Sequence, residues 1–217
     1  MAIRKIVTVG GPREKVLRTR AKKVTRFDPY IERLVDDLWE TMRAAPGVGL
    51  AAPQVGESIR VLVAEFEDER VALVNPEILK TEGEVLGTEG CLSIPGYVGD
   101  NVPRAESIAI KGRDPRGKEI RLRAEGWWAR ILQHEIDHLD GVLYTDHVQP
   151  QDIREVTEED AAEEGAPQPR NQQKRAAAQV TQAAEASGAM ANAAAPSVAG
   201  KAPAPGGAGA AGRGDSA

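Results

Sequence analysis

The amino-acid sequence predicts an α+β fold, with short, mainly antiparallel strands packed around a buried central helix that carries the motif H-E-x-x-H. Residues 126–139 are apolar on several sides, which is typical of a helix enclosed by other elements. Short runs rich in β-branched residues precede this stretch, and turn sequences separate them. These two observations favour helices and strands that share one core.

Two helices are expected from capping signals and apolar spacing. Asp28 is a good N-cap and Pro29 suits the first helical position, so a helix is expected to begin there. Apolar residues recur at helical spacing as far as Met42, and Pro46 then ends the pattern. The second helix covers residues 126–139. The glycine at 141 is its expected C-terminal stop.

Strands are expected at residues 59–66, 71–75, 107–111 and 119–123, which are short and rich in β-branched residues. The last two flank the sequence Asp-Pro-Arg-Gly at 114–117. Such a sequence forms turns readily, because proline fixes one backbone angle and glycine accepts positive φ. The sequence therefore predicts a hairpin immediately before the second helix.

His134, Glu135 and His138 form the H-E-x-x-H motif within the second predicted helix. Residues four apart lie one turn above each other on a helix face, so both imidazoles can point at one metal ion. Glu135 is then close enough to a water on that metal to take its proton. Buried polar groups without partners cost about 1–3 kcal/mol each, and a metal supplies a partner. The motif predicts a metal-dependent hydrolase.

Composition divides the chain near residue 150. Residues 1–150 contain the expected elements and the motif, and they form the predicted catalytic metallohydrolase domain. Residues 151–164 are polar and acidic, and we expect a connecting segment there. Residues 165–217 are rich in Ala, Gly and Pro with almost no large apolar side chain. Because they cannot bury enough surface to offset the entropy of ordering, a disordered tail is expected.

Charge and composition limit the classes of partner that the protein is expected to bind. The net charge of −5 and the isoelectric point near 5.4 argue against nucleic acid or an anionic membrane as the main partner. The sequence has no nucleic-acid-binding motif, no signal peptide, and no apolar run of the roughly 20 residues that span a bilayer. Its single cysteine fits a reducing compartment. The expectation is a soluble cytoplasmic protein.

The third metal ligand decides the class of hydrolase, and the residues leave alternatives open. In one protease arrangement a third histidine follows the motif, but Tyr144 holds that position and His147 comes three residues later. In a zinc endopeptidase a glutamate follows, and Glu158 or Glu159 could serve. Cys91, which precedes the H-E-x-x-H motif in the sequence, is a further candidate for the third metal ligand. A thiolate with two imidazoles and a water makes a four-coordinate site with an open position, which is typical of a catalytic metal.

Three segments stand out in order along the chain. Residues 47–54 read G-V-G-L-A-A-P-Q, residues 89–93 read E-G-C-L-S, and residues 133–141 read Q-H-E-I-D-H-L-D-G. These segments match the motifs G-x-G-L-A-A-x-Q, E-G-C-L-S and Q-H-E-x-D-H-L-x-G of the peptide deformylase family without a mismatch. The chain resembles that family through its whole globular part, and a zinc endopeptidase of the H-E-x-x-H type remains the alternative.

The resemblance implies that Cys91, His134 and His138 bind one divalent metal, Fe²⁺ in the cell, with Zn²⁺, Ni²⁺ or Co²⁺ able to occupy the same site. It implies hydrolysis of the N-formyl group from N-formylmethionine at the start of newly made polypeptides, with release of formate. Glu135 would take the proton of the attacking water and pass it to the leaving amine.

Further residues acquire roles only through the resemblance. The Gln54 side-chain amide and the Leu92 backbone N–H are expected to donate to the tetrahedral oxyanion. Gly47, Val48 and Gly49 are expected to pair with the substrate as an added strand. Val48 and Ile131 are expected to line the methionine pocket, since Ile131 lies one turn before the first histidine.

The expected partners are N-formylmethionyl nascent peptides. Some relatives dock on the ribosome through a basic C-terminal helix, but residues 152–164 are acidic here. A transient ribosome contact is therefore left open, and no membrane partner is expected.

Overall fold

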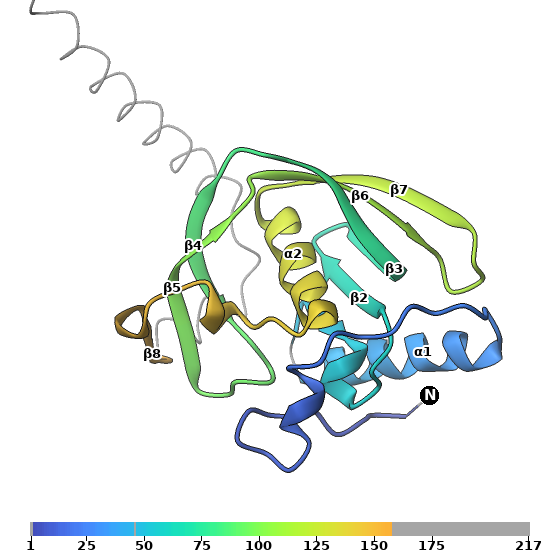
Figure 1. The fold of residues 1–217 in the computed structure, drawn as a ribbon, viewed down its shortest axis with the longest axis horizontal. Helices are drawn as coiled ribbons and strands as arrows, with labels where there is room; N and C mark the ends of the chain where they lie inside the picture. Colours follow the sequence, from blue (N-terminus) through green and yellow to red (C-terminus); the bar gives the residue numbers. More distant parts are fainter. Residues whose placement is uncertain (1, 46, 158–217) are drawn as a thin grey trace, which may run out of the picture. The chain divides into compact units, whose positions relative to one another are not determined.

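A computed structural model describes residues 2–45 and 47–157 of the chain (Figure 1). The α-helices are α1 (Pro29–Ala44) and α2 (Gly126–Asp140). The strands in the described ranges are β1 (Gly49–Ala51), β2 (Val61–Phe66), β3 (Glu69–Glu82), β4 (Val85–Gly90), β5 (Tyr97–Arg104), β6 (Ser107–Arg113), β7 (Glu119–Glu125) and β8 (Ile153–Glu155). Short 3₁₀ helices are η1 (Glu14–Val16), η2 (Ala52–Val55), η3 (Tyr144–Asp146) and η4 (Pro150–Asp152).

The larger sheet is antiparallel, with strand order β1-β2-β3-β6-β7. Strand β2 shows how this sheet separates two apolar layers. Leu62 and Ala64 pack in the cluster that contains α2, whereas Val61 and Val63 pack in the cluster that contains α1. Successive side chains of a strand point to opposite faces, so a run of apolar residues can serve both helices. The two α-helices therefore cover opposite faces of the sheet.

The first helix begins and ends close to the predicted positions. The Asp28 side chain accepts a hydrogen bond from the Tyr30 backbone N–H, and Pro29 occupies the first turn. The apolar stripe of α1 is buried against β1, β2 and η2. Its polar residue Asp37 is also buried and binds the N-terminal segment, accepting from Arg4 Nε at 2.8 Å and from Ala2 N at 2.7 Å.

The second helix, α2, lies at the centre of the described chain in Figure 1, between the larger sheet and the strands β4 and β5. Its apolar residues, among them Leu132 and Leu139, are fully buried. The helix ends at Gly141, whose φ of 78° lies in the left-handed region that glycine adopts without strain. A helix enclosed in this way holds its polar side chains in fixed positions.

The smaller sheet has the order β4-β5-β8 and is antiparallel. Strand β8 pairs Tyr97–Gly99 of β5 with Ile153–Glu155. The sequence places the end of the catalytic domain at residue 150, but paired structure continues to at least residue 155. Residues 158–164 of the acidic segment and the Ala/Gly/Pro-rich tail lie outside the described residues.

The structure confirms the α+β prediction and the hairpin, which is formed by β6 and β7. The strand expected at 71–75 is part of the longer β3, which continues through irregular pairing near Asn75. The Asn-Pro pair at residues 75–76 is typical of the end of a strand, which is why the predicted strand was too short. In the structure β3 continues through this pair, with Asn75 at a φ of 53°. Within the described ranges, no helix is long and apolar enough to cross a membrane.

Candidate active site

The buried helix and the segment after β4 bring three potential metal ligands together. The ligand atoms of Cys91, His134 and His138 all lie within 4.8 Å of one another, and Cys91 Sγ is 3.2 Å from His138 Nε2. The histidines lie one helical turn apart on α2, while the cysteine directly follows β4. Within residues 2–45 and 47–157, this is the group whose geometry could hold a metal ion.

The surroundings of Cys91 favour its thiolate form. Burial alone would raise the pKa of its thiol, but the positive charge of His138 and hydrogen bonds with both histidines lower that pKa well below its usual range. The thiolate is the form that binds metals. A metal at the usual bond lengths of about 2.0–2.3 Å would separate these ligand atoms by roughly 3.4–3.6 Å, a spacing this group can adopt.

Glu135 is buried beside these ligands and is 4% exposed. Among the described residues, its Oε2 has no hydrogen-bond partner, and neither has His138 Nδ1. Burial raises the pKa of Glu135 to about 7, although the charges of His134 and His138 act in the opposite direction. Such a carboxyl group can both accept and release a proton near neutral pH. An orphaned, buried carboxylate next to three ligand atoms fits a site that holds a metal and a water.

Gly49 makes room for this carboxylate. A Cβ atom added at Gly49 would lie only 2.3 Å from Glu135 Oε1, so any other residue would displace the glutamate. Gly47 likewise lies close to the cysteine loop, because its Cβ would lie 2.8 Å from Leu92 Cδ1. The glycines of the first motif are therefore needed for close approach between β1, α2 and the cysteine loop.

The Gln54 amide is oriented toward the same centre. Its Oε1 accepts from the Ala51 backbone N–H at 2.8 Å, which leaves the NH₂ group facing Ser93 Oγ at 3.3 Å and Cys91 Sγ at 3.7 Å. The side chain is 2% exposed. Because the amide oxygen is already engaged, this residue presents donors, and not an acceptor, to the site.

A buried ion-pair network contacts His134 at its Nδ1 atom. Glu89 Oε2 lies 2.8 Å from His134 Nδ1, and Glu89 also accepts from Arg104 Nε and Nη2 at 2.8 and 2.9 Å. Arg130 Nη1 donates to Glu89 Oε1 at 2.8 Å. Burial opposes ionisation of Glu89, but the hydrogen bonds from Arg104 and His134 hold its pKa well below the usual range. The carboxylate fixes the ring orientation of His134 and leaves Nε2 for a metal.

The predicted substrate-binding residues lie around this centre. Val48 is 45% exposed, whereas Gly49 is buried and Ile131 is 6% exposed one turn before His134. Gly49 pairs with β2 through β1, an edge strand of the larger sheet. An edge strand has backbone groups free for a further strand, as the added-strand expectation requires.

The alternative third ligands receive no support. His147 Nε2 lies 2.7 Å from Asp137 Oδ2 and outside the group that could hold a metal, while Glu158 and Glu159 lie outside the described residues. Sequence reasoning missed Arg130, which closes the network around Glu89. Its i, i+4 spacing from His134 on a buried helix was the available signal.

The comparisons with known proteins agree with this geometry. Residues 3–154 match the family model described as polypeptide deformylase. A peptide deformylase from Symbiobacterium thermophilum is 54% identical over 169 residues, covering 76% of this chain and 75% of that protein. One from Dehalococcoides mccartyi is 49% identical over 163 residues, covering 74% of this chain and 95% of that protein.

Solved structures give the same answer. The peptide deformylase from Thermotoga maritima has a TM-score of 0.65 at 41% identity, covering 69% of this chain and 100% of that one. The Legionella pneumophila enzyme has a TM-score of 0.65 at 44% identity, covering 70% of this chain and 89% of that one. Nothing in these comparisons supports a zinc endopeptidase. The chain belongs to the polypeptide deformylase family, the metal-dependent hydrolases that remove the formyl group from newly made polypeptides.

Proposed function

We propose that Cys91, His134 and His138 hold the single metal of this deformylase, and that Fe²⁺ occupies the site in the cell. The observation that carries the proposal is the convergence of one sulfur and two imidazole nitrogens beside an orphaned, buried carboxylate. When bound, a divalent metal supplies a Lewis acid and a water whose pKa is lowered toward neutrality. Zn²⁺, Ni²⁺ and Co²⁺ suit the same ligands.

Glu135 moves the proton in this proposal. Its Oε2, which has no hydrogen-bond partner among the described residues, receives the proton of the attacking water and then donates it to the amine nitrogen that leaves the formyl carbon. Burial supports both transfers, because a carboxyl group with a pKa of about 7 holds and releases a proton with similar ease near neutral pH. Asp137, in contrast, pairs with Arg104 and His147 and takes no part in the proton transfer.

Gln54 and Leu92 stabilise the oxyanion that forms from the formyl oxygen. The Gln54 NH₂ group is directed toward the centre by the bond between its Oε1 and Ala51 N. The Leu92 backbone N–H belongs to the residue directly after the proposed cysteine ligand, whose Sγ lies 3.7 Å from Gln54 Nε2. Loss of one such donor typically costs about 10²–10³ in rate.

The peptide is proposed to bind as an extra strand along Gly47, Val48 and Gly49, with the methionine side chain between Val48 and Ile131. The position of β1 at the sheet edge supports this arrangement. Because the substrate is a nascent peptide, we place the enzyme's work in the cytoplasm, with a transient encounter at the ribosome where such peptides emerge.

Formate release from a formyl-Met peptide tests the catalytic assignment. Glu135→Gln should retain the metal but lose about 10²–10⁴ of the activity, because the proton acceptor is gone. Glu32→Gln changes an exposed glutamate of α1 and serves as the matched control, with activity unchanged. A Glu135→Gln enzyme that releases formate at the rate of the unmodified protein would overturn the assignment.

Metal analysis of Cys91→Ala separates the proposal from the endopeptidase. In the proposal the variant loses its metal and its activity, whereas an endopeptidase with a glutamate or His147 as third ligand would keep the metal.

For the identity of the ion, protein purified without oxygen should contain iron and lose activity faster in air than under argon. Equal half-lives in both atmospheres would contradict native iron.

A further inference from the structure

A continuous chain of polar contacts leads from the surface to the metal ligand His134. Its inner part is the bond between Glu89 Oε2 and His134 Nδ1 at 2.8 Å, backed by the two bonds from Arg104 to Glu89. Its outer part continues from Arg104 Nη1 to Asp137 Oδ2 at 2.5 Å. The last member is His147, whose Nε2 lies 2.7 Å from the same Asp137 oxygen and 3.5 Å from Arg104 Nη1.

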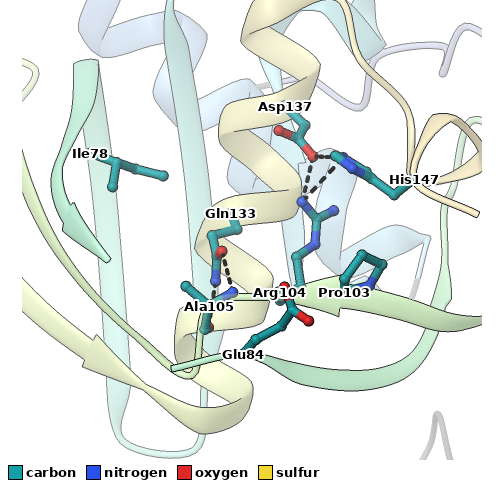
Figure 2. Close-up of a pocket in the computed structure, with 8 residues that line it drawn as sticks. All are labelled: Ile78, Glu84, Pro103, Arg104, Ala105, Gln133, Asp137 and His147. Carbon is teal, nitrogen blue, oxygen red and sulfur yellow. Dashed lines mark hydrogen bonds and ion pairs between the residues drawn. The ribbon is translucent and has the colours of Figure 1, made fainter. Parts of the chain in front are cut away.

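Figure 2 shows this outer part, with Asp137 of α2 directed toward both Arg104 of β5 and His147, which follows η3. The three side chains, together with Glu84, line an open cavity of about 310 Å³. Exposure rises along the chain, since the side chains of Arg104, Asp137 and His147 are 4%, 22% and 31% exposed. His147 is therefore the solvent-facing end of the chain, and the metal ligand is its buried end.

The chain of polar contacts reaches one of the two proposed histidine ligands, His134. His134 Nδ1 is bonded to Glu89, whereas His138 Nδ1 has no partner among the described residues. A carboxylate on the second ring nitrogen fixes the orientation of a metal-bound imidazole and raises its strength as a ligand. The hydrogen-bonded carboxylate thus orients the His134 ring. A displacement of Arg104 or Glu89 would therefore change the position of this proposed ligand.

Arg104 depends on Asp137 for its position. One edge of its guanidinium is occupied by Glu89, and Nη1 is directed to Asp137. Asp137 is itself shared between Arg104 and His147, and a carboxylate held from two sides has one preferred orientation. Without the His147 ring, Asp137 can rotate toward the cavity, and the guanidinium loses its fixed outer partner.

We propose that His147 is a positioning residue for the deformylation reaction: through Asp137, Arg104 and Glu89 it holds the ring of the metal ligand His134 in place. Within the described part of the chain, the polar contacts of the His147 side chain are with Asp137 and Arg104, and the proposal is that it acts through them. The proposal rests on the assignment of His134 as a ligand. A metal bound without His134 would refute that assignment, whereas the experiment below addresses His147 alone.

The test uses the full-length protein loaded with Co²⁺, and it measures the rate of metal loss to a chelator, the cobalt absorption spectrum, and kcat and KM. Replacing a direct partner of a metal ligand typically costs 10–100-fold in affinity or activity, so for this more distant residue we expect His147→Leu to speed metal loss by about 3–10-fold. The cobalt bands should shift, and kcat should fall with KM unchanged. His147→Gln places an N–H donor near the position of Nε2 and should restore all three values.

Asp146→Asn is the matched control. Asp146 is the neighbouring residue in η3, and it caps the Leu143 backbone N–H and pairs with Arg18 without touching the chain of contacts. We expect it to lower the melting temperature while leaving metal loss and the cobalt spectrum unchanged. Unchanged metal loss in His147→Leu, or the same acceleration in Asp146→Asn, would overturn the proposal. If His147→Leu does not fold, His147→Ser is judged by the same criteria.

Discussion

At the scale of single residues, the site depends on close approach between a glycine backbone and a buried acid. Gly49 lies on β1 and Glu135 on α2, and the space between them accommodates no Cβ atom. The glycine is thus part of the catalytic geometry although it carries no functional group. In the proposed mechanism its role is to leave space for the Glu135 carboxylate.

Gly49→Ala should therefore impair catalysis without emptying the metal site. The new methyl group would lie 2.3 Å from Glu135 Oε1, so the carboxylate must move, and a displacement of about 1 Å can cost about 100-fold in rate. Kinetics of formate release together with metal analysis would measure this. Gly112→Ala is the control, because its Cβ meets only ordinary contacts at 3.4 Å and beyond. Full activity in Gly49→Ala would contradict the proposed position of the base.

Single residues also show how far sequence reasoning reaches. His134, Glu135 and His138 were predicted because their types and spacing match a chemistry that few arrangements perform. Cys91 was one of several candidate third ligands until the family resemblance favoured it. Arg130, which donates to Glu89 inside the fold, was missed. The i, i+4 spacing places Arg130 on the same face of α2 as His134, but it does not show that Glu89 of β4 meets both side chains. Contacts between different elements emerge only from the fold.

At the scale of elements, Glu89 joins β4 to β5 and α2. Its carboxylate accepts from Arg104 of β5 and from Arg130 and His134 of α2, and all of these contacts are buried or nearly so. Removing one member of a buried ion pair is much more costly than losing a surface pair, because the remaining charges stay desolvated. We infer that this carboxylate links the stability of the smaller sheet to metal binding at the proposed site.

Glu89→Gln should lower the free energy of unfolding by about 3–5 kcal/mol, because two buried arginines lose their charged partner. It should also weaken metal binding by about 10–100-fold through His134. Urea unfolding and competition with a metal chelator measure the two effects. The control is Glu65→Gln, which removes an exposed pair with Arg43 and should change stability by less than about 1 kcal/mol. Equal losses in the two variants would contradict the role of the network.

Asp37 links α1 to the N-terminal segment in a pH-dependent way. Burial acts to raise its pKa, but the hydrogen bonds from Arg4 and the Ala2 backbone outweigh it and lower the pKa below the usual value. A carboxyl group with a lowered pKa in the folded state stabilises the fold above its unfolded pKa. That stabilisation is lost as the pH falls through the folded pKa.

Asp37→Asn should therefore reduce the free energy of unfolding at pH 7 by about 1–3 kcal/mol, since Arg4 loses its charged acceptor. The stabilities of variant and unmodified protein should begin to converge as the pH falls below about 4, the unfolded pKa, and should meet only below the lowered folded pKa, where the aspartate is protonated in both states. Chemical denaturation across that range is the measurement. A difference that stays constant from neutral to acid pH would show that the charge of Asp37 is not involved.

Among the elements, the helices and the hairpin could be predicted, because caps, apolar spacing and a turn sequence specify them locally. Strands β1, β4 and β5 were not predicted. They contain glycines and polar residues that favour no strand on their own, and they are held by pairing with neighbours and by contacts with α2. Gly49 of β1 lies against Glu135 of α2, and Cys91 directly follows β4, so these strands bring their residues to the site by close approach and not by local preference.

At the scale of the whole molecule, the family model covers residues 3–154 and the paired structure reaches β8. We propose that residues 1–157 contain everything the catalytic activity needs. This places the functional boundary slightly beyond the residue 150 that composition indicates, because a three-residue strand produces no change in composition.

A protein truncated after residue 157 should keep the melting temperature and the activity of the full chain. Truncation after residue 150 removes β8 and its pairing with β5, and should lower the melting temperature, because a protein of this size loses about 2–4 °C for each kcal/mol. Thermal unfolding and formate release compare the two proteins. Loss of activity in the longer truncation product would show that residues beyond 157 take part.

The most direct measurement of the metal centre is X-ray absorption spectroscopy of the full-length protein loaded with Zn²⁺. We predict one sulfur at about 2.3 Å and two imidazole nitrogens at about 2.0–2.1 Å from the ion. In Cys91→Ala the sulfur contribution should disappear. A metal shell that contains only nitrogen and oxygen in the unmodified protein would contradict the ligand set on which the proposed mechanism depends.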